Sequence, residues 1–149
     1  GALERMSELT IEYTSQRRQF GRPVAAFQAV QIHLVNGAQN AVLATMAGQQ
    51  AAAALQSDPT HAAFEIASAK LLASEAAHTA TQAAHQAHGA MGMTQDYALH
   101  HFSRRLWSWQ SEYGDERYWA ARLGRATATA GAERLYPAVT AGSAVLPAV

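Results

Sequence analysis

The fold of this chain is decided at residues 13–28, which read YTSQRRQFGRPVAAFQ. Tyr13 and Arg17 are one helical turn apart, so they share one face of a helix predicted over residues 2–18. Gly21 and Pro23 interrupt the helical pattern, since glycine favours a turn and proline lacks a backbone donor. A second helix is predicted to begin at about residue 25. The stretch therefore predicts two helices joined by a sharp corner.

Beyond this corner the chain is rich in alanine and nearly free of strand-like alternation, which indicates an all-α protein. Glycine and proline breakers divide it into about five helices, predicted over residues 2–18, 25–56, 59–88, 94–113 and 115–132. Asp58 is expected to cap the third helix and Thr94 the fourth. Two very long helices joined by a short turn predict an up-and-down four-helix bundle with an extra C-terminal helix. We expect residues 1–135 to form this helical domain and residues 136–149 a loose tail.

The composition excludes several classes of protein. The 149 residues are 49% apolar and 15% charged, which is typical of one globular domain. Eleven acidic and eleven basic side chains cancel, so we expect neither nucleic acid nor an anionic membrane as a partner. The sequence has no cysteine, which excludes disulfides and thiolate metal sites and fits a cytoplasmic protein. No apolar run approaches the ~20 residues of a membrane span, and no signal peptide is recognisable.

The corner resembles the Y-x-x-x-R-x-Q-F-G…F-Q signature that opens the C-terminal helical domain of acyl-CoA dehydrogenases. Taken alone, Arg17 is best interpreted as a solvated cation at a helix C-terminus, but its neighbours fall at the family spacing. The resemblance implies that the segment of Arg17, Gln19 and Phe20 holds the pyrophosphate of FAD, partly across a subunit interface. It also implies that Phe27 and Gln28 lie against FAD.

A second signature lies at residues 86–93, which read QAHGAMGM. It resembles the family turn Q-x-x-G-G-x-G-[FY], which approaches the adenosine diphosphate part of the neighbouring subunit's FAD. Gly89 allows the backbone to come close to a ligand, whereas Ala90 and Met93 depart from the pattern. The resemblance covers residues 3–132 and implies Gln86, His88, Gly89 and Ala90 as further cofactor contacts.

The usual catalytic position lies within residues 104–115, which read RRLWSWQSEYGD. The resembled enzymes commonly use a glutamate of a Y-E-G-T segment to take the substrate α-proton. Counting from Arg104 to Gly114 places Tyr113 there, and a phenol of ordinary pKa ~10 is a poor base beside a carboxylate tuned to ~6–7. Glu112 is one residue away, a rotation of about 100° on a helix. We therefore expect no catalytic residue of the usual kind in this chain.

Three explanations of the missing base remain open. The base can lie upstream on the same polypeptide. Alternatively, the subunit is non-catalytic and pairs with a catalytic paralogue, as in the heterotetrameric dehydrogenases of actinobacterial steroid side-chain degradation. In the third explanation, the protein catalyses a different reaction on an acyl-CoA-like ligand.

The resemblance implies a part of a longer flavoprotein oxidoreductase of lipid metabolism, acting in fatty acid or steroid degradation. The whole protein would oxidise an acyl-CoA thioester at its α,β-carbons, with FAD as hydride acceptor and an electron-transfer flavoprotein as oxidant. It would form a homo-oligomer or a hetero-tetramer with a paralogous subunit, and this chain alone would be inactive. The rival hypothesis is a helical assembly subunit that retains the scaffold without a redox role.

One pattern suggests a metal and is rejected. Glu75 and His78 form an E-x-x-H unit of the kind found in di-iron bundles, which would also need a second such unit and two further carboxylates. None of these is apparent, so no metal site is predicted. A dense set of aromatic residues in the fourth and fifth helices is either core or an oligomer anchor, and the sequence leaves this choice open; it comprises Trp107, Trp109, Tyr113, Tyr118 and Trp119.

Overall fold

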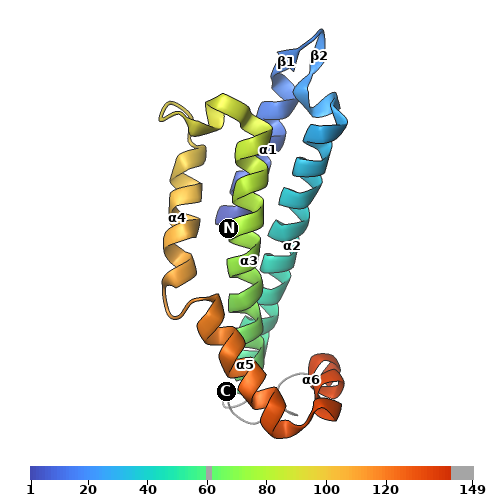
Figure 1. Cartoon of the computed structure of the whole chain (residues 1–149), viewed down its shortest axis with the longest axis vertical. Helices are drawn as coiled ribbons and strands as arrows, with labels where there is room; N and C mark the ends of the chain where they lie inside the picture. Colours follow the sequence, from blue (N-terminus) through green and yellow to red (C-terminus); the bar gives the residue numbers. More distant parts are fainter. Residues whose placement is uncertain (60–61, 142–149) are drawn as a thin grey trace. The chain divides into compact units, whose positions relative to one another are not determined.

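The computed structural model describes residues 1–59 and 62–141 of the chain (Figure 1). Within these ranges the all-α prediction is confirmed. The α-helices are α1 (Ala2–Gln16), α2 (Gln28–Ser57), α3 (Ala63–His88), α4 (Leu99–Ser111), α5 (Glu116–Ala130) and α6 (Leu135–Ala141). Short 3-10 helices cover Val24–Ala26, Gly89–Met93 and Ala132–Arg134. Strands β1 (Arg18–Gln19) and β2 (Arg22–Pro23) form a small antiparallel hairpin.

The chain divides into two compact units that share the long helices α2 and α3. The first unit contains Gly1–Leu43 and Glu75–Trp109, and the second contains Ala44–Ser74 and the residues from Gln110 onward. No helix in the described ranges combines the length and apolar character needed to cross a membrane.

The first unit is the four-helix bundle, built from α1, the first part of α2, the last part of α3, and α4. In Figure 1 its α3 lies between α2 and α4, with α1 behind. Its core consists of a few large apolar side chains and many alanines. The small alanine side chains allow the helix backbones to come close together. The buried apolar residues are Leu3, Met6, Ala41, Ala76, Ala77, Ala80, Ala83, Ala84, Ala87, Leu99 and Leu106.

The second unit contains the remaining halves of α2 and α3, together with α5 and α6. The end of α4 is tied to α3 here, because Nε2 of Gln110 donates a hydrogen bond of 2.8 Å to the carbonyl of Ser74. Asp115 caps α5 by accepting a hydrogen bond from the backbone N–H of Tyr118. At its C-terminus α5 ends at Gly131, whose φ of 95° lies in the left-handed region.

Two predicted caps were wrong. Helix α3 begins at Ala63, with residues 60–61 outside the described ranges, so Asp58 is not the residue before its first turn; the backbone N–H of Asp58 still donates to the carbonyl of Ala54 and so closes α2. Thr94 does not cap α4, because its hydroxyl donates to the carbonyl of Met91 and closes the preceding 3-10 helix. The hydroxyl of Thr94 thus satisfies a carbonyl that comes before it in the chain.

Other helix boundaries differ from the prediction by a few residues. Helix α1 ends at Gln16 rather than residue 18, because Arg18 already pairs with Pro23 in the hairpin. Helix α2 begins at Gln28 rather than residue 25, after one 3-10 turn. Helix α6 occupies the first part of the segment predicted to be a loose tail, and residues 142–149 lie outside the described ranges.

Candidate functional site

The first signature forms the corner between α1 and α2. Phe20 and Gly21 have φ of 51° and 79°, so this two-residue loop has the positive φ values of a type I′ hairpin. The N–H of Val24 donates to the carbonyl of Arg17 at 2.8 Å and closes the base of the corner. A non-glycine residue at positive φ is uncommon, and Phe20 is 91% exposed. The corner thus holds an aromatic side chain out into solvent.

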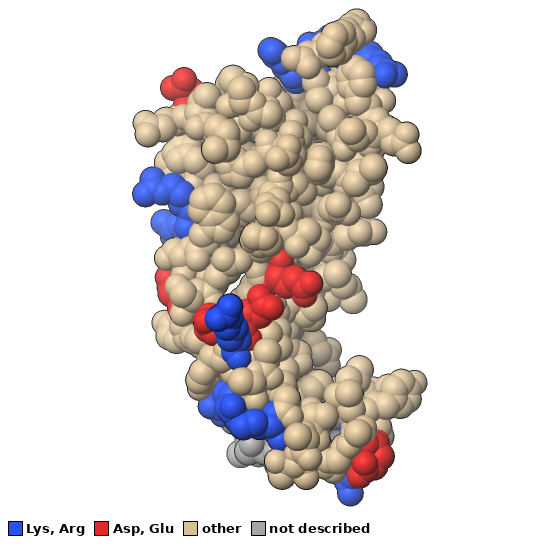
Figure 2. All heavy atoms as spheres, in the orientation of Figure 1, with Lys and Arg blue, Asp and Glu red and all other residues tan. Residues whose placement is uncertain are grey.

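Three arginines surround this hairpin, where Figure 2 shows basic side chains gathered. The guanidinium of Arg18 donates to the carbonyl of Gly21 at 2.9 Å. Arg22 lies over the ring of Phe27, 4.1 Å from its centroid. Arg17 is exposed, and its side chain has no ion pair or hydrogen bond within the described part of the chain. The side chain of Arg17 is therefore open to an external anion.

The other residues of the first signature lie beside these arginines. Phe20 and Phe27 meet edge to face with centroids 6.2 Å apart. Gln19 and Gln28 are exposed, so their amide groups are open to a ligand. Sequence reasoning missed Arg22, which the hairpin brings onto the Phe27 ring; its position five residues before an aromatic residue was the only available signal.

The second signature meets the first through stacked rings. His88 ends α3 and is only 4% exposed. Its ring lies parallel to that of Tyr13 at a centroid distance of 4.5 Å and an angle of 19°. Tyr97 completes the cluster, 4.9 Å from His88 and 5.4 Å from Tyr13. The structure therefore places the end of α3 against the end of α1, although the two signatures are far apart in sequence.

The surroundings of His88 explain why its pKa is lowered. Its Nδ1–H donates to the carbonyl of Ala84 at 2.8 Å, and its buried Nε2 has no hydrogen-bond partner. Burial lowers the pKa of His88, the hydrogen bond to Ala84 partly opposes this, and the neighbouring His85 adds to the decrease. A neutral ring at pH 7 suits its stacking role.

The backbone after His88 is exposed. Gly89 has φ of 59° and ends the helix, and Gln86, Gly89 and Ala90 all face solvent. The structure thus exposes three of the four predicted contacts of this signature and buries His88 beneath them. Gly92 is required by packing, because a Cβ there would lie 2.9 Å from Cβ of His88 and 3.3 Å from Cδ2 of Leu99.

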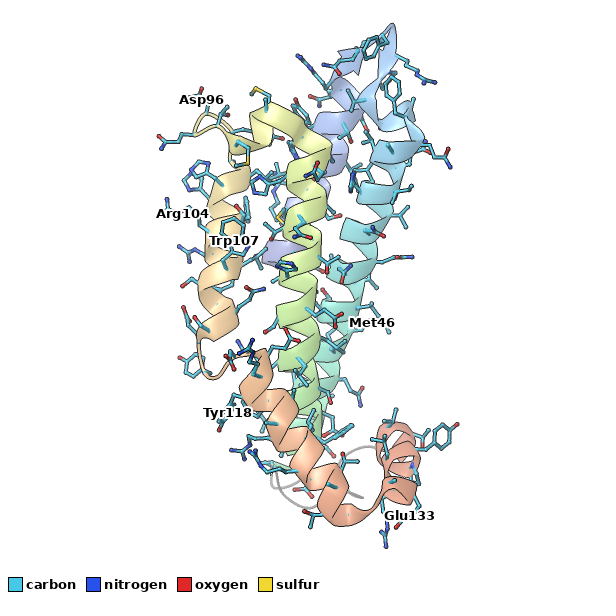
Figure 3. All side chains as sticks on the ribbon, in the orientation of Figure 1. Met46, Asp96, Arg104, Trp107, Tyr118 and Glu133 are labelled. Carbon is cyan, nitrogen blue, oxygen red and sulfur yellow. The ribbon has the colours of Figure 1, made fainter. Side chains whose placement is uncertain are left out.

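A cavity of about 560 Å³ opens beside this turn in the first unit. Figure 3 shows Trp107 on α4, and its indole lies nearly parallel to the ring of His85 at 6.3 Å. Burial lowers the pKa of His85, and the Gly92 backbone partly opposes the shift. Polar side chains from α2 and α3 also line the cavity, including His33, Asn36, Gln82 and Gln86.

The usual catalytic position lies in the second unit, between α4 and α5. Tyr113 has φ of 58° and is 91% exposed, a backbone conformation that costs on the order of 1–3 kcal/mol for such a residue. Gly114 follows with φ of 97°. The indole Nε1–H of Trp119 donates to the carbonyl of Tyr113 at 3.1 Å. The phenol is therefore presented to solvent on a braced turn.

Glu112, the residue before Tyr113, interacts electrostatically with Lys70. Burial lowers the pKa of Lys70 on α3, and the negative charge of Glu112 partly offsets that shift. The carboxylate of Glu112 thus stabilises the charged ammonium group of Lys70, which belongs to the same unit.

No metal centre is found in the described ranges, where no three His, Asp or Glu side chains are grouped closely enough to hold an ion. The E-x-x-H unit of Glu75 and His78 has no such companions there.

Comparison with known proteins finds the family that the two signatures resemble. Residues 1–128 match the family described as acyl-CoA dehydrogenase, C-terminal domain. The acyl-CoA dehydrogenase IpdE2 of Mycobacterium tuberculosis is 37% identical over 107 residues, which cover 70% of this chain and 31% of that protein. The chain thus spans about a third of the length of such a relative.

Solved structures share the fold. The ChsE4-ChsE5 complex from Mycobacterium tuberculosis matches with a TM-score of 0.78 and 31% identity, covering 84% of this chain and 34% of that one. The FAD complex of PigA matches with a TM-score of 0.76 and 25% identity, covering 83% of this chain and 32% of that one.

Proposed function

Because this chain belongs to the acyl-CoA dehydrogenase family, we propose that it forms the C-terminal helical part of a longer, FAD-dependent acyl-CoA dehydrogenase. The complete protein would oxidise an acyl-CoA thioester between its α- and β-carbons, and bound FAD would supply a hydride acceptor. In this proposal the chain contributes cofactor contacts and the core of an oligomer. The observation that carries it is the exposed Arg17 at the base of the hairpin, one helical turn after Tyr13, whose ring stacks on His88 of the second signature.

The residues of the first unit fit the diphosphate of FAD. A planar guanidinium that makes no internal ion pair suits bidentate binding of phosphate oxygens. Arg18 and Arg22 are already engaged with Gly21 and Phe27, which leaves Arg17 as the proposed diphosphate ligand. The exposed amides of Gln19 and Gln28 can hydrogen-bond to other polar groups of the cofactor.

The exposed backbone at Gly89 and Ala90 offers a second contact, where the absence of a large side chain permits close approach. Gln86 stands beside it with an exposed amide. His88 would act from beneath, because its stacking on Tyr13 holds the two signatures together.

The carboxylate that takes the substrate proton would come from outside this chain. Tyr113 occupies the usual position, and Glu112 acts on Lys70. Two sources remain: an upstream segment of the same polypeptide, or a catalytic paralogue in a hetero-tetramer. The solved ChsE4-ChsE5 structure is a complex of two different proteins that includes a chain of this fold. This supports the paralogue as the source of the carboxylate.

Assembly is supported by exposed apolar side chains on α2 of the first unit. Ile32, Val35, Val42 and Leu43 are each about half exposed, and their helical spacing places them along one stripe. Apolar surface of this kind marks contact sites between proteins. We propose a homo-oligomer or a hetero-tetramer, with an electron-transfer flavoprotein as the redox partner and a cytoplasmic location.

The test is flavin content. The complete protein, purified alone and with its candidate paralogous partner, should carry the absorbance of bound flavin in at least one of these states. A colourless protein in every combination would instead support the rival hypothesis of a helical assembly subunit. The family match and the FAD-bound structural relative favour the dehydrogenase.

A further inference from the structure

The cavity of about 560 Å³ in the first unit has no part in the proposed function. Its volume lies in the range of about 300–1,000 Å³ that is typical of pockets for small molecules. Gln86 is the one described lining residue that it shares with the proposed cofactor contacts; the rest of the lining comes from α2, from the preceding turns of α3, and from Met93 and Trp107. None of the described residues that line the cavity is Asp, Glu, Lys or Arg.

The hydroxyl of Thr81 is the first sign of a binding site in this cavity. Thr81 is only 1% exposed, and its Oγ1 has no hydrogen-bond partner in the described ranges. Thr10 and Thr14, which are also buried, instead donate to the backbone carbonyls of Met6 and Thr10. A buried hydroxyl without a partner is destabilising. Because Thr81 lines the cavity, a ligand bound there would provide the missing partner.

His85 lies one turn further along the same face of α3. Its Nε2 is buried and has no hydrogen-bond partner in the described part of the chain. Burial lowers the pKa of His85, so the ring is neutral at pH 7 and can both donate and accept a hydrogen bond. Two buried polar groups on successive turns of α3 therefore line the same cavity without internal partners.

The remaining side chains of the lining suit a flat, uncharged ring. The indole of Trp107 and the imidazole of His85 lie within 18° of parallel, and such aromatic faces stack on nucleobases. The amide groups of Asn36, Gln82 and Gln86 can pair with a ring edge that carries both a donor and an acceptor, as amides pair with adenine. A phosphate or carboxylate, in contrast, would meet no Lys or Arg among these described residues.

We propose that the cavity binds an uncharged heteroaromatic ring of the nucleobase type, as a site separate from the proposed flavin site. The hydroxyl of Thr81 and Nε2 of His85 would hydrogen-bond to the edge of the ring, and Trp107 would cover its face. Arg17, the proposed ligand of the FAD diphosphate, does not line the cavity. The cavity can thus be tested whether or not the complete protein carries flavin.

The test measures the binding of adenosine to the complete protein, saturated with FAD, by calorimetry. Adenosine is uncharged and carries a ring of this type, and AMP adds only a phosphate. Thr81→Val removes the hydroxyl at nearly constant volume, and His85→Phe keeps an aromatic ring without its nitrogens. Thr127→Val serves as the control, since Thr127 lies on α5 in the second unit and its hydroxyl donates to the carbonyl of Leu123.

Adenosine should bind to the wild-type protein, and AMP should bind no more tightly than adenosine. Thr81→Val and His85→Phe should each weaken adenosine binding about three- to tenfold, as for the loss of one hydrogen bond, and Thr127→Val should not. The ligand-free Thr81→Val protein should melt at an unchanged or higher temperature, because the substitution removes a buried hydroxyl that has no partner. A lower melting temperature with unchanged adenosine binding indicates a structural role and would overturn the proposal.

Three other outcomes would also overturn it. The first is a wild-type protein that does not bind adenosine. The second is adenosine that binds only to the apoprotein and is displaced by FAD, which would place the ring in the cofactor site and leave the dehydrogenase assignment intact. The third is a changed oligomer mass in His85→Phe with unchanged adenosine binding, which would assign the cavity to a contact between subunits. A protein that carries no flavin but binds adenosine as expected would remove the proposed function and support the cavity site.

Discussion

Three arginines at the hairpin differ in what they already contact. Arg18 donates to Gly21 and Arg22 covers Phe27, whereas Arg17 is exposed at the corner. In the complete protein, Arg17→Ala should weaken FAD binding roughly ten- to hundredfold, because a charge-assisted contact contributes about 1.5–3 kcal/mol. Arg18→Ala should have a much smaller effect. FAD titration of the two apoproteins makes the comparison.

This pair of variants separates a specific contact from a general loss of charge. If FAD affinity is unchanged in Arg17→Ala, or decreases equally in both variants, then the first signature serves the scaffold only. The assignment of the diphosphate site would have to be withdrawn in that case.

His88 should make the stability of this chain depend on pH. Burial lowers its pKa from the ordinary 6.5, so the unfolded state binds more protons than the folded state below that value. The contribution of the neutral ring is complete above pH ~6.5 and is lost as the pH falls through the lowered pKa of the folded state. The urea midpoint should therefore decrease between pH 7.5 and pH 5.

Variants identify the residue responsible. His88→Phe keeps an aromatic ring beside Tyr13 and Tyr97 and should weaken this pH dependence. Part of the pH dependence should remain, because burial also lowers the pKa of His85. His101→Gln, at an exposed position on α4, should leave it unchanged. An undiminished slope in His88→Phe would show that other groups control acid stability.

At the scale of elements, the turn between α4 and α5 depends on one glycine. Gly114 has φ of 97°, and a Cβ there would approach both Tyr118 and the indole of Trp119, at 2.6 Å and 3.0 Å. Gly114→Ala should therefore reduce the free energy of unfolding by about 2 kcal/mol or more. Urea unfolding of the chain measures this change.

The matched control lies on the helix that follows. Gly124 is within α5, and a Cβ there meets no atom within 4 Å. Gly124→Ala should raise the free energy of unfolding by about 0.5–1 kcal/mol, because alanine favours the helical backbone. Equal effects of the two substitutions would contradict the role assigned to the turn.

At the scale of the whole molecule, the exposed apolar stripe on α2 should drive self-association. Sedimentation of the chain at micromolar concentration should give a dimer or larger species. Val42→Glu places a charge in the stripe and should shift the distribution towards monomer, since burying an unpaired charge is costly. Ser15→Glu, at an exposed polar position on α1, should leave it unchanged. A wild-type monomer at every concentration would contradict this role of α2.

Local preferences account for the parts of the fold that the sequence predicted. The corner at Gly21 and Pro23, the helix stop at Gly89 and the helix start at Asp115 all depend on residues within one or two turns of each other. The same reasoning was wrong at Thr94, because the hydroxyl of a short polar residue can satisfy a carbonyl before it instead of an N–H after it. It was also wrong at Asp58, because α3 begins only at Ala63. Helix boundaries within a few residues of such positions were therefore not predictable.

The candidate site likewise has features that the sequence predicted and contacts that only the structure revealed. Sequence by itself determined the helical class and the family signatures, including a phenol where a carboxylate is usual, because these depend on residue type and spacing. Only the tertiary structure decided that His88 is buried against Tyr13 and that Glu112 acts on Lys70. These partners are distant in the chain and come close together only when the helices of each unit pack, so no local pattern could specify them.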